Sequence, residues 1–270
     1  MSLAIRSRLR DARYALPGLI ERNVRGQDVD AAIRACAALE SKGYATTLGY
    51  FHRGSESAHE VAEVSGKLAT GLAKAGLDSL VAVKGNALDC DQCLLDPLGA
   101  KGVPLVFDAM TPAHAARILD LAAAYAAGIA LPARWRRSAQ DAARLRDGPC
   151  RIRLVKGEWA DPDADTPDIA GAYVDLSRQL AGRSAMVGVA THDPDLAEAA
   201  LSVLLAAGTP CELEQLRGLP RRRTMAVAKR LGVKVRLYYP FGPGWWPYAI
   251  DKALSRPYLP IWALKDALGR

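Results

Sequence analysis

Polar side chains end many of the short apolar runs in this sequence. The residues at these positions are Lys84, Asp108, Arg153, Lys156, Thr191, His192, Asp193, Glu212, Glu214 and Tyr238. A single lysine at the end of a strand is usually only the exit to solvent. Several charged residues that end separate strands on one rim predict a polar site above an apolar core.

Arg153 and Lys156 stand three residues apart in the segment Arg-Leu-Val-Lys-Gly, at one of these strand ends. Because Arg153 alternates with Val155 along the strand, its side chain is a candidate to point inward. Two inward cations would hold an anion or stabilise negative charge on a cofactor ring. The alternative is structural, with Arg153 in an ion pair with a neighbouring glutamate.

His192 lies in the segment Thr-His-Asp at another strand end, where it is a candidate general base. The alternative is a histidine whose hydrogen bonds serve only the fold. Lys84 and Asp108 end adjacent strands and are candidates for an ion pair across the rim. The predicted rim therefore carries both acidic and basic groups.

Six aromatic residues lie within the eleven residues 238–248. The Pro and Gly residues between them predict an irregular segment, followed by a helix over about 247–255. An aromatic loop over a barrel mouth would exclude water and cover a flat ligand. The alternative is a packing plug or a subunit interface.

Short apolar runs alternate with longer helical stretches, which predicts parallel strands joined by crossover helices. Leading helices are predicted over 3–24 and 28–42, the second with Asp28 as its N-cap. Two later helices, over 112–127 and 193–207, are expected to open with turn chemistry, with Thr111 before Pro112 and Asp193 before Pro194. Eight strands are predicted, over 44–48, 79–84, 103–108, 128–131, 150–156, 185–191, 211–215 and 233–238.

Eight strands are the number that closes a (β/α)8 TIM-type barrel, an α/β fold for which 270 residues is a common length. We therefore expect one domain over 1–270, with N-terminal helices in 1–43 and the barrel in 44–270. A doubly wound sheet is the alternative, but the residues after the first strand do not fit the GxGxxG fingerprint.

The chain is basic, with a formal charge of +7 and a pI near 9.2. Dense basic runs occur only at 134–137 and 221–223, which favours solvated faces over a nucleic-acid partner. The N-terminus lacks the apolar core of a signal peptide, and no stretch is long enough to span a membrane. A cytoplasmic protein is expected, whose basic surface would help a peripheral approach to a membrane.

Five cysteines include a single CxxC pair, formed by Cys90 and Cys93. A zinc site needs further cysteine or histidine ligands, and the sequence shows none nearby. We therefore expect ordinary thiols and no metal.

Several of these segments resemble motifs of the proline dehydrogenase family of flavoenzymes. Residues 151–157 resemble its strand-5 motif, and Ala-Thr-His-Asp at 190–193 resembles a second one. Lys84, Asp108 and Tyr238 match its strand-2 lysine, strand-3 aspartate and strand-8 tyrosine. The resemblance implies an oxidoreductase with a distorted (β/α)8 barrel that holds FAD over the strand ends. It also implies that a hydride passes to flavin N5 from proline or a similar amino or imino acid.

The resemblance implies roles for individual residues. The implied catalytic residues are Lys84, Asp108, Arg153 and Tyr238. The implied FAD-binding residues are Arg153, Val155, Lys156, Gly157, Thr191 and His192. The implied substrate-binding residues are Trp159, Leu216, Tyr248, Asp251 and Lys252. A free or membrane-bound quinone is the implied electron acceptor, and the oligomeric state is left open.

Departures from the family pattern predict an altered substrate. The family helix with the pattern Tyr-x-x-Arg-Arg keeps Tyr248, but Asp251 and Lys252 replace the two arginines that grip the proline carboxylate. A lysine lacks the arginine fork and an aspartate repels a carboxylate, so proline should bind weakly. Trp159 replaces the family's substrate-side tyrosine.

Two further departures concern the cofactor. Pro132 replaces a strand-4 glutamine that is a flavin hydrogen-bond partner in the family, and the short acidic segment 161–168 replaces a region that carries an adenine-side lysine. The loss of these contacts predicts weaker binding of FAD.

Three hypotheses remain open. The first is a flavin-dependent amine or imino-acid dehydrogenase in which Asp251 meets a cationic group of a changed substrate. The second is a barrel that has lost redox chemistry and only binds a partner. The third is a Schiff-base lyase with Lys84 or Lys156 as nucleophile. It requires a lysine with a lowered pKa, whereas Asp108 nearby should favour the charged form.

Overall fold

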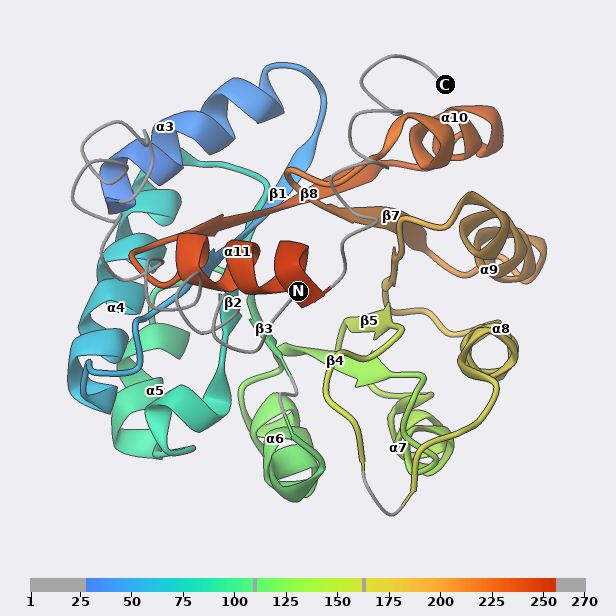
Figure 1. Cartoon of the computed structure of the whole chain (residues 1–270), viewed down its shortest axis with the longest axis horizontal. Coiled ribbons are helices and arrows are strands. Elements are labelled where there is room, and N and C mark those ends of the chain that lie inside the picture. Colours follow the sequence, from blue (N-terminus) through green and yellow to red (C-terminus); the bar gives the residue numbers. More distant parts are fainter. Residues whose placement is uncertain (1–27, 109–110, 162–163, 256–270) are drawn as a thin grey trace, which may run out of the picture.

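A computed structural model describes residues 28–108, 111–161 and 164–255, and the side chains of 252–255 lie outside this description. Its eight parallel strands close a barrel in chain order, because the first strand pairs with both the second and the last (Figure 1). The strands are β1 (Ala45–Tyr50), β2 (Ser79–Val83), β3 (Leu105–Phe107), β4 (Gly128–Pro132), β5 (Ile152–Val155), β6 (Val187–Ala190), β7 (Cys211–Leu216) and β8 (Val235–Phe241). The predicted (β/α)8 fold is confirmed.

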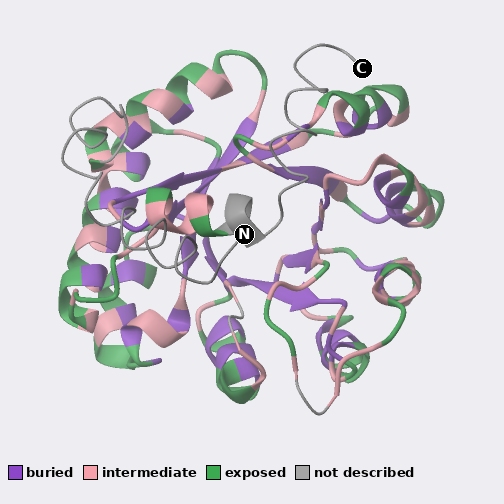
Figure 2. Cartoon of the chain, viewed as in Figure 1, coloured by how far each residue is buried: buried purple, intermediate pink, exposed green. Residues whose placement is uncertain are grey.

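Helices surround the barrel and turn their buried faces toward the strands (Figure 2). These helices are α3 (Val29–Glu40), α4 (Ala58–Ala75), α5 (Gln92–Gly99), α6 (Pro112–Ala124), α7 (Ser138–Leu145), α8 (Ile169–Gln179), α9 (Pro194–Ala206) and α10 (Arg222–Leu231). A short 3-10 helix, η1 (Gly85–Leu88), follows β2, and α11 (Trp245–Ser255) follows β8. The helix predicted over 3–24 lies outside the described residues.

Cap residues set the starts of the helices. Asp28 caps α3 as predicted, and its Oδ1 accepts a hydrogen bond from the backbone N–H of Ala31 at 2.6 Å. Asp193 caps α9, whose first residue is Pro194. This cap fixes the turn that joins β6 to α9 at the carboxyl end of the barrel.

β8 is longer than predicted and continues into the segment expected to be irregular. It runs through Pro240 to Phe241, and these residues pair with Gly49 and Tyr50 of β1. On the other side, the pairing of β8 with β7 ends at Tyr238. A proline beyond that point lies where the strand has one neighbour, so its missing N–H is tolerated. α11 then begins at Trp245, two residues before the predicted start.

The apolar core lies between the strands and the helices, with residues such as Ile152, Leu154, Val187 and Val189 fully buried there. Side chains on the opposite face of each strand point to the barrel axis, because neighbours along a strand alternate. TIM barrels usually fill this interior with layers of bulky branched apolar residues. In this chain much of the interior between β5, β7 and β8 is charged.

Candidate active site

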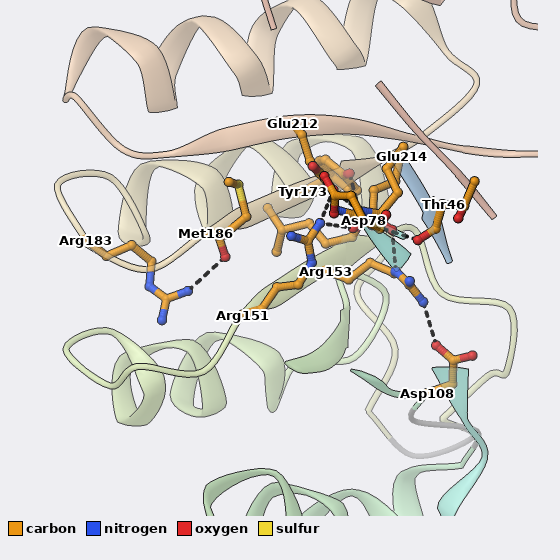
Figure 3. A network of polar contacts seen from close by, with 12 residues as sticks. Thr46, Asp78, Asp108, Arg151, Arg153, Tyr173, Arg183, Met186, Glu212 and Glu214 are labelled. Carbon is orange, nitrogen blue, oxygen red and sulfur yellow. Dashed lines mark hydrogen bonds and ion pairs between the residues drawn. The ribbon is translucent and has the colours of Figure 1, made fainter. Parts of the chain in front are cut away.

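A chain of ion pairs runs along the barrel interior from the amino ends of the strands to their carboxyl ends (Figure 3). We call these seven residues the ion-pair column. They are Asp78, Arg236, Glu212, Arg151, Glu214, Arg153 and Asp108. Asp78 precedes β2 at the lower end, and Asp108 follows β3 at the upper end.

The lower half of the column centres on Arg236. Its Nε donates to Glu212 at 2.5 Å and its Nη2 to Asp78 at 2.9 Å, while its Nη1 donates to the Thr46 carbonyl at 2.7 Å. Glu212 also accepts from Arg151. Both Arg236 and Glu212 are buried, so these charges are satisfied by one another rather than by solvent.

The upper half of the column centres on Glu214. Its Oε1 accepts from Arg151 at 2.6 Å and its Oε2 from Arg153 Nε at 2.6 Å. Burial would raise the pKa of Glu214, but the guanidinium groups of Arg153 and Arg151 outweigh it and hold the pKa well below its usual range. Glu214 is therefore an anion at neutral pH.

A glycine on the neighbouring strand makes room for this pair. A Cβ on Gly188 of β6 would lie 2.0 Å from Glu214 Oε1 and 3.1 Å from Arg151 Nη2. The space beside Glu214 therefore depends on the absence of a side chain at position 188.

Arg153 ends the column at the rim. Its Nη1 donates to Asp108 Oδ1 at 2.9 Å, and its guanidinium lies 5.3 Å from the centroid of the Tyr238 ring. Burial opposes its charge, but Glu214 and Asp108 raise the pKa of Arg153 above its ordinary value. Within the described residues, its buried Nη2 has no hydrogen-bond partner. At the mouth, this donor is available to an acceptor from a ligand.

Tyr238 reaches across the barrel mouth from β8 toward β1 and β3. Its Oη donates to Asp108 Oδ2 at 3.4 Å, and burial together with Asp108 raises the pKa of its hydroxyl well above the usual value. A Cβ on Gly49 of β1 would lie 1.9 Å from this Oη. Gly49 therefore leaves the space that Tyr238 occupies.

Lys84 lies at the rim but does not form the ion pair with Asp108 that was expected. Its Nζ is 3.3 Å from the centroid of the Phe51 ring, while Asp108 accepts from Arg153. Burial lowers the pKa of Lys84 to about 8, although Asp108 and Glu158 act in the opposite direction. Asp108 favours the charged form of this lysine, as expected, but desolvation is the larger effect and the net pKa falls.

α11 spans the mouth of the barrel, in front of the strands in Figure 1. On one side Tyr248 and Trp245 pack on Phe51, which follows β1, with ring centroids 5.2 Å apart in each pair. On the other side Tyr248 Oη donates to Glu158 Oε2, after β5, at 2.5 Å. Since β1 and β5 lie on opposite sides of an eight-stranded ring, these contacts hold the helix across the opening.

Among the implied cofactor residues, Lys156 is not the second inward cation. Its side chain is 46% exposed and its Nζ lies 3.1 Å from Asp193 Oδ2. Gly157 has a positive φ of 95°, and a Cβ there would lie 2.9 Å from Arg134 Cβ and 3.0 Å from Pro132 Cβ. The structure thus explains Gly157 by the close packing of the loop on the end of β4.

His192 uses both ring nitrogens in contacts with the backbone. Its Nε2 accepts from the N–H of Leu216 at 3.0 Å, so its Nδ1 carries the proton and donates to the Pro220 carbonyl at 2.7 Å. Thr191 is also engaged, because its hydroxyl accepts from the N–H of Asp193 at 3.1 Å. These bonds match the structural alternative for His192 and leave neither ring nitrogen to act as a general base.

The remaining implied residues lie at different depths around the mouth. Val155 and Leu216 end their strands on the inward face, two positions beyond Arg153 and Glu214. Trp159 is 44% exposed, and its carbonyl accepts from Trp135 Nε1 at 2.8 Å. Asp251 is exposed on α11. The side chain of Lys252 is outside the described part, so the structure does not place it.

Two arginines of the basic run 134–137 pair with acidic side chains, while Arg136 is exposed. Arg134 Nε lies 2.5 Å from Asp165, and Arg137 Nε lies 2.8 Å from Asp141. Asp165 belongs to the acidic segment, and residues 164–166 of that segment lie against this run. The segment that departs from the family pattern has a local structural role.

Cys90 is buried and Cys93 is exposed, and both are free thiols. Among the described residues, no group of three or more His, Cys, Asp or Glu side chains could hold a metal ion. In the same ranges, no helix is long and apolar enough to cross a membrane.

Sequence reasoning placed Glu212 and Glu214 on the rim, and this was wrong because both lie buried inside the barrel. It missed the part played by Arg151, Arg236 and Asp78. The signal was present in the two-residue spacing of Arg151 with Arg153 and of Glu212 with Glu214. Residues two apart on a strand lie on the same face. Two arginines so spaced on one strand and two glutamates so spaced on another predict inward ion pairs between the strands. No such signal exists for the contact between Glu158 and Tyr248.

These features define a (β/α)8 barrel with a charged site at the carboxyl ends of its strands, where the active sites of barrel enzymes lie. No family model matches the sequence. The chain is nevertheless similar to proteins named proline dehydrogenase. Proline dehydrogenase 1 of Bacillus subtilis (strain 168) is 24% identical over 276 residues, which cover 92% of this chain and 90% of that protein. The proline dehydrogenase of Deinococcus radiodurans is 27% identical over 279 residues, which cover 91% and 89%.

Solved structures of proline utilization A (PutA) have the same fold. The protein from Bdellovibrio bacteriovorus, inactivated by N-propargylglycine, gives a TM-score of 0.73 at 19% identity over 89% of this chain. The protein from Corynebacterium freiburgense gives 0.68 at 18% identity over 93%. This chain spans about a third of the length of those proteins, since the matches cover 34% and 33% of them. The predicted resemblance to proline dehydrogenases is confirmed.

Proposed function

We propose that this barrel is a flavin-dependent oxidoreductase that oxidises an amine or imino acid related to proline. The sequence similarity to proline dehydrogenases supports the reaction class. The observation that carries the proposal is the buried Arg153, whose Nη2 lacks a partner among the described residues at the mouth. Bound FAD would accept two electrons and a proton, as a hydride, from the carbon next to the substrate nitrogen.

The residues present fit the ring of a flavin better than its nucleotide end. Arg153 offers a fixed cation and a donor, which would stabilise negative charge on a reduced ring. Val155, Lys156 and Gly157 follow it at the same strand end. Thr191 and His192 would serve as part of the wall, since their polar atoms already bond to the backbone. Pro132 has no side-chain donor to offer at the end of β4.

Lys84, Asp108 and Tyr238 form the substrate side of the proposed site. An amine substrate reaches the site as an ammonium ion and must lose a proton before the carbon–hydrogen bond breaks. Lys84, with a pKa lowered to about 8, is partly neutral near that pH, and its Nζ can then accept this proton. Asp108 holds Tyr238 and Arg153 in place around the substrate.

The acidic groups at the mouth favour a substrate other than proline. Glu158 and Asp251 lie on or against α11, where the family pattern places arginines that bind a carboxylate. Carboxylates repel the carboxylate of proline and attract a cationic group. We therefore propose a substrate that carries an amine in addition to, or in place of, the carboxylate. The quinone acceptor stays a prediction.

Anaerobic titration of the FAD-loaded protein tests this proposal. The visible flavin bands are expected to bleach with a cationic cyclic amine at lower concentrations than with proline. Arg153→Met should abolish bleaching, whereas Arg144→Met, which removes an exposed arginine on α7, should leave it unchanged. A protein that does not take up FAD, or a flavin that no amine reduces, would refute the proposal.

A gain-of-function variant tests the altered substrate separately. Replacing Asp251 and Lys252 by arginine restores the two charges of the family pattern. Proline should then bleach the flavin at concentrations at least tenfold lower. If the variant binds FAD but gains nothing toward proline, the account of substrate choice is wrong while the flavin chemistry stands.

A Schiff-base lyase is the second candidate, and the lowered pKa of Lys84 favours it. Borohydride treatment in the presence of a panel of aldehydes and ketones would trap such a bond as a mass increase on Lys84. Lys84→Met is the control that removes the nucleophile. The absence of a trapped adduct in a protein that bleaches with amines would reject this candidate.

A further inference from the structure

Two carboxylates from two different strands hold the guanidinium group of Arg153. Glu214 of β7 accepts from Nε at 2.6 Å, and Asp108 after β3 accepts from Nη1 at 2.9 Å. A guanidinium group is planar and rigid. Fixing two of its nitrogens therefore fixes the third, Nη2, which is the one that has no partner in the described ranges.

Glu214 is built into the barrel for this contact. It is 3% exposed, and its second oxygen accepts from Arg151. Gly188 leaves the space that its carboxylate fills. By contrast, Asp108 is partly exposed and also contacts Tyr238, so it has a second task at the mouth.

We propose that Glu214 is a positioning residue that acts through Arg153. It holds Nη2 of Arg153 toward the ligand, and its negative charge limits the positive potential that a bound flavin ring experiences. The proposal rests on the proposed function for its role in redox chemistry, while the positioning of Arg153 can be tested without the cofactor.

The charge effect follows from distance. A carboxylate in direct contact with Arg153 offsets much of the arginine's potential in a medium of low effective dielectric constant. Removing that charge while keeping the shape of the side chain leaves a stronger cation at the same place. Glu214→Gln should therefore make the site bind anions more tightly.

The chain offers a matched control in Glu212. It lies two residues earlier on the same inward face of β7, and it contacts Arg151 and Arg236 rather than Arg153. Glu212→Gln makes the same chemical change one layer further from the mouth. Any effect of a general loss of buried negative charge should appear in both variants.

Sulfite binding to the FAD-loaded protein measures the potential at the flavin ring. Its dissociation constant is expected to fall roughly tenfold in Glu214→Gln and less than about threefold in Glu212→Gln. Glu214→Asp keeps the charge and shortens the reach, so it should leave sulfite affinity closer to that of the unmodified protein. Equal effects of Glu214→Gln and Glu212→Gln would overturn the assignment.

If Glu214→Gln does not fold, a second variant tests the same proposal. Glu214→Gln combined with Arg151→Gln removes one charge of each sign and restores the balance of the column. Arg153 keeps Asp108 but still lacks the charge of Glu214 in this double variant, so the tighter binding of sulfite should persist. A sulfite affinity equal to that of the unmodified protein would overturn the charge effect.

A measurement without flavin tests the positioning alone. The side-chain Nε–Hε signal of Arg153 can be assigned by NMR as the one lost in Arg153→Lys. Its exchange with solvent should be at least tenfold faster in Glu214→Gln than in Glu212→Gln. Unchanged exchange would refute the positioning role, whereas a protein that shows the change but takes up no FAD refutes only the proposed redox function.

Discussion

Charged side chains are paired in the interior of the barrel, whereas the lysine at its mouth has no carboxylate partner among the described residues. In the interior, Glu212 and Glu214 each contact two arginines, and the pKa of Glu214 lies well below its usual range. At the mouth, Lys84 lies over an aromatic ring, and the described residues include no carboxylate within ion-pair distance of its Nζ. Burial lowers its pKa to about 8. Glu214 in the interior thus keeps its charge at neutral pH, while Lys84 at the mouth can gain or lose a proton near pH 8.

Breaking the interior column should have the largest effect on stability. Arg236→Met leaves the buried Glu212 with one of its two arginines, which costs about 3–5 kcal/mol in the free energy of unfolding. Arg144→Met is the matched control, because its ion pair with Asp120 is more than half exposed and contributes less than about 1 kcal/mol. Urea unfolding of the two variants measures the difference. Equal losses would mean that the column contributes no more than a surface pair.

Replacing the lysine at the mouth should change how stability depends on pH. The pKa of Lys84 is about 8 in the folded chain and about 10.4 when unfolded, so its protonated form is disfavoured by folding. The cost is present in full below pH 8 and is relieved as the pH rises from about 8 to about 10.4. Lys84→Met removes this cost, on the order of 2–3 kcal/mol at pH 7.

The difference in unfolding free energy between Lys84→Met and the unmodified protein should shrink across that pH window. Comparing the two proteins cancels the titration of other lysines and tyrosines. Arg236→Met, in the interior, should show no such window. A constant difference from pH 7 to pH 10 would mean that Lys84 is not desolvated in the folded chain.

Tyr238 lies where the interior meets the mouth, and the absence of a side chain at Gly49 leaves room for its hydroxyl. Gly49→Ala puts a methyl group where the Tyr238 hydroxyl lies, which should cost about 2 kcal/mol through overpacking. Adding Tyr238→Phe removes the hydroxyl and should recover part of the loss, so the two changes should not be additive. Thermal unfolding of the two single variants and the double variant measures this coupling. Additive losses would show that the two side chains do not compete for space.

Much of the fold was predictable, because it follows from local patterns. All eight strands lie where the apolar runs placed them, and Asp28 and Asp193 cap helices as the turn chemistry indicated. The extension of β8 through Pro240 was not predictable. A proline in a strand is tolerated only where one side is unpaired, and this depends on where β7 ends.

The site was predictable in its members more than in its contacts. Arg153, Asp108 and Tyr238 do come together, but Lys84 lies over Phe51, and Lys156 points to solvent. Which cation pairs with which carboxylate depends on small differences in reach across the barrel. Such differences come from residues such as Gly49 and Gly188, whose effect is to leave space. A sequence pattern shows which residues are charged and how they are spaced along the chain, but it does not show how much room each side chain has inside the barrel.

Loss of the hydrogen bond between Tyr248 and Glu158 at the mouth should have the smallest effect on global stability, and its effect should be confined to α11. Tyr248→Phe removes the hydrogen bond to Glu158, at a cost of about 1 kcal/mol, because the group is only partly buried. Amide hydrogen exchange in α11 should become several-fold faster, while exchange in β5 and β7 stays unchanged. Tyr125→Phe removes a similar contact, with Asp96, on the outside of the barrel, and should leave α11 unaffected. If both variants changed exchange in α11 alike, the tyrosine at the mouth would not be what holds the helix across it.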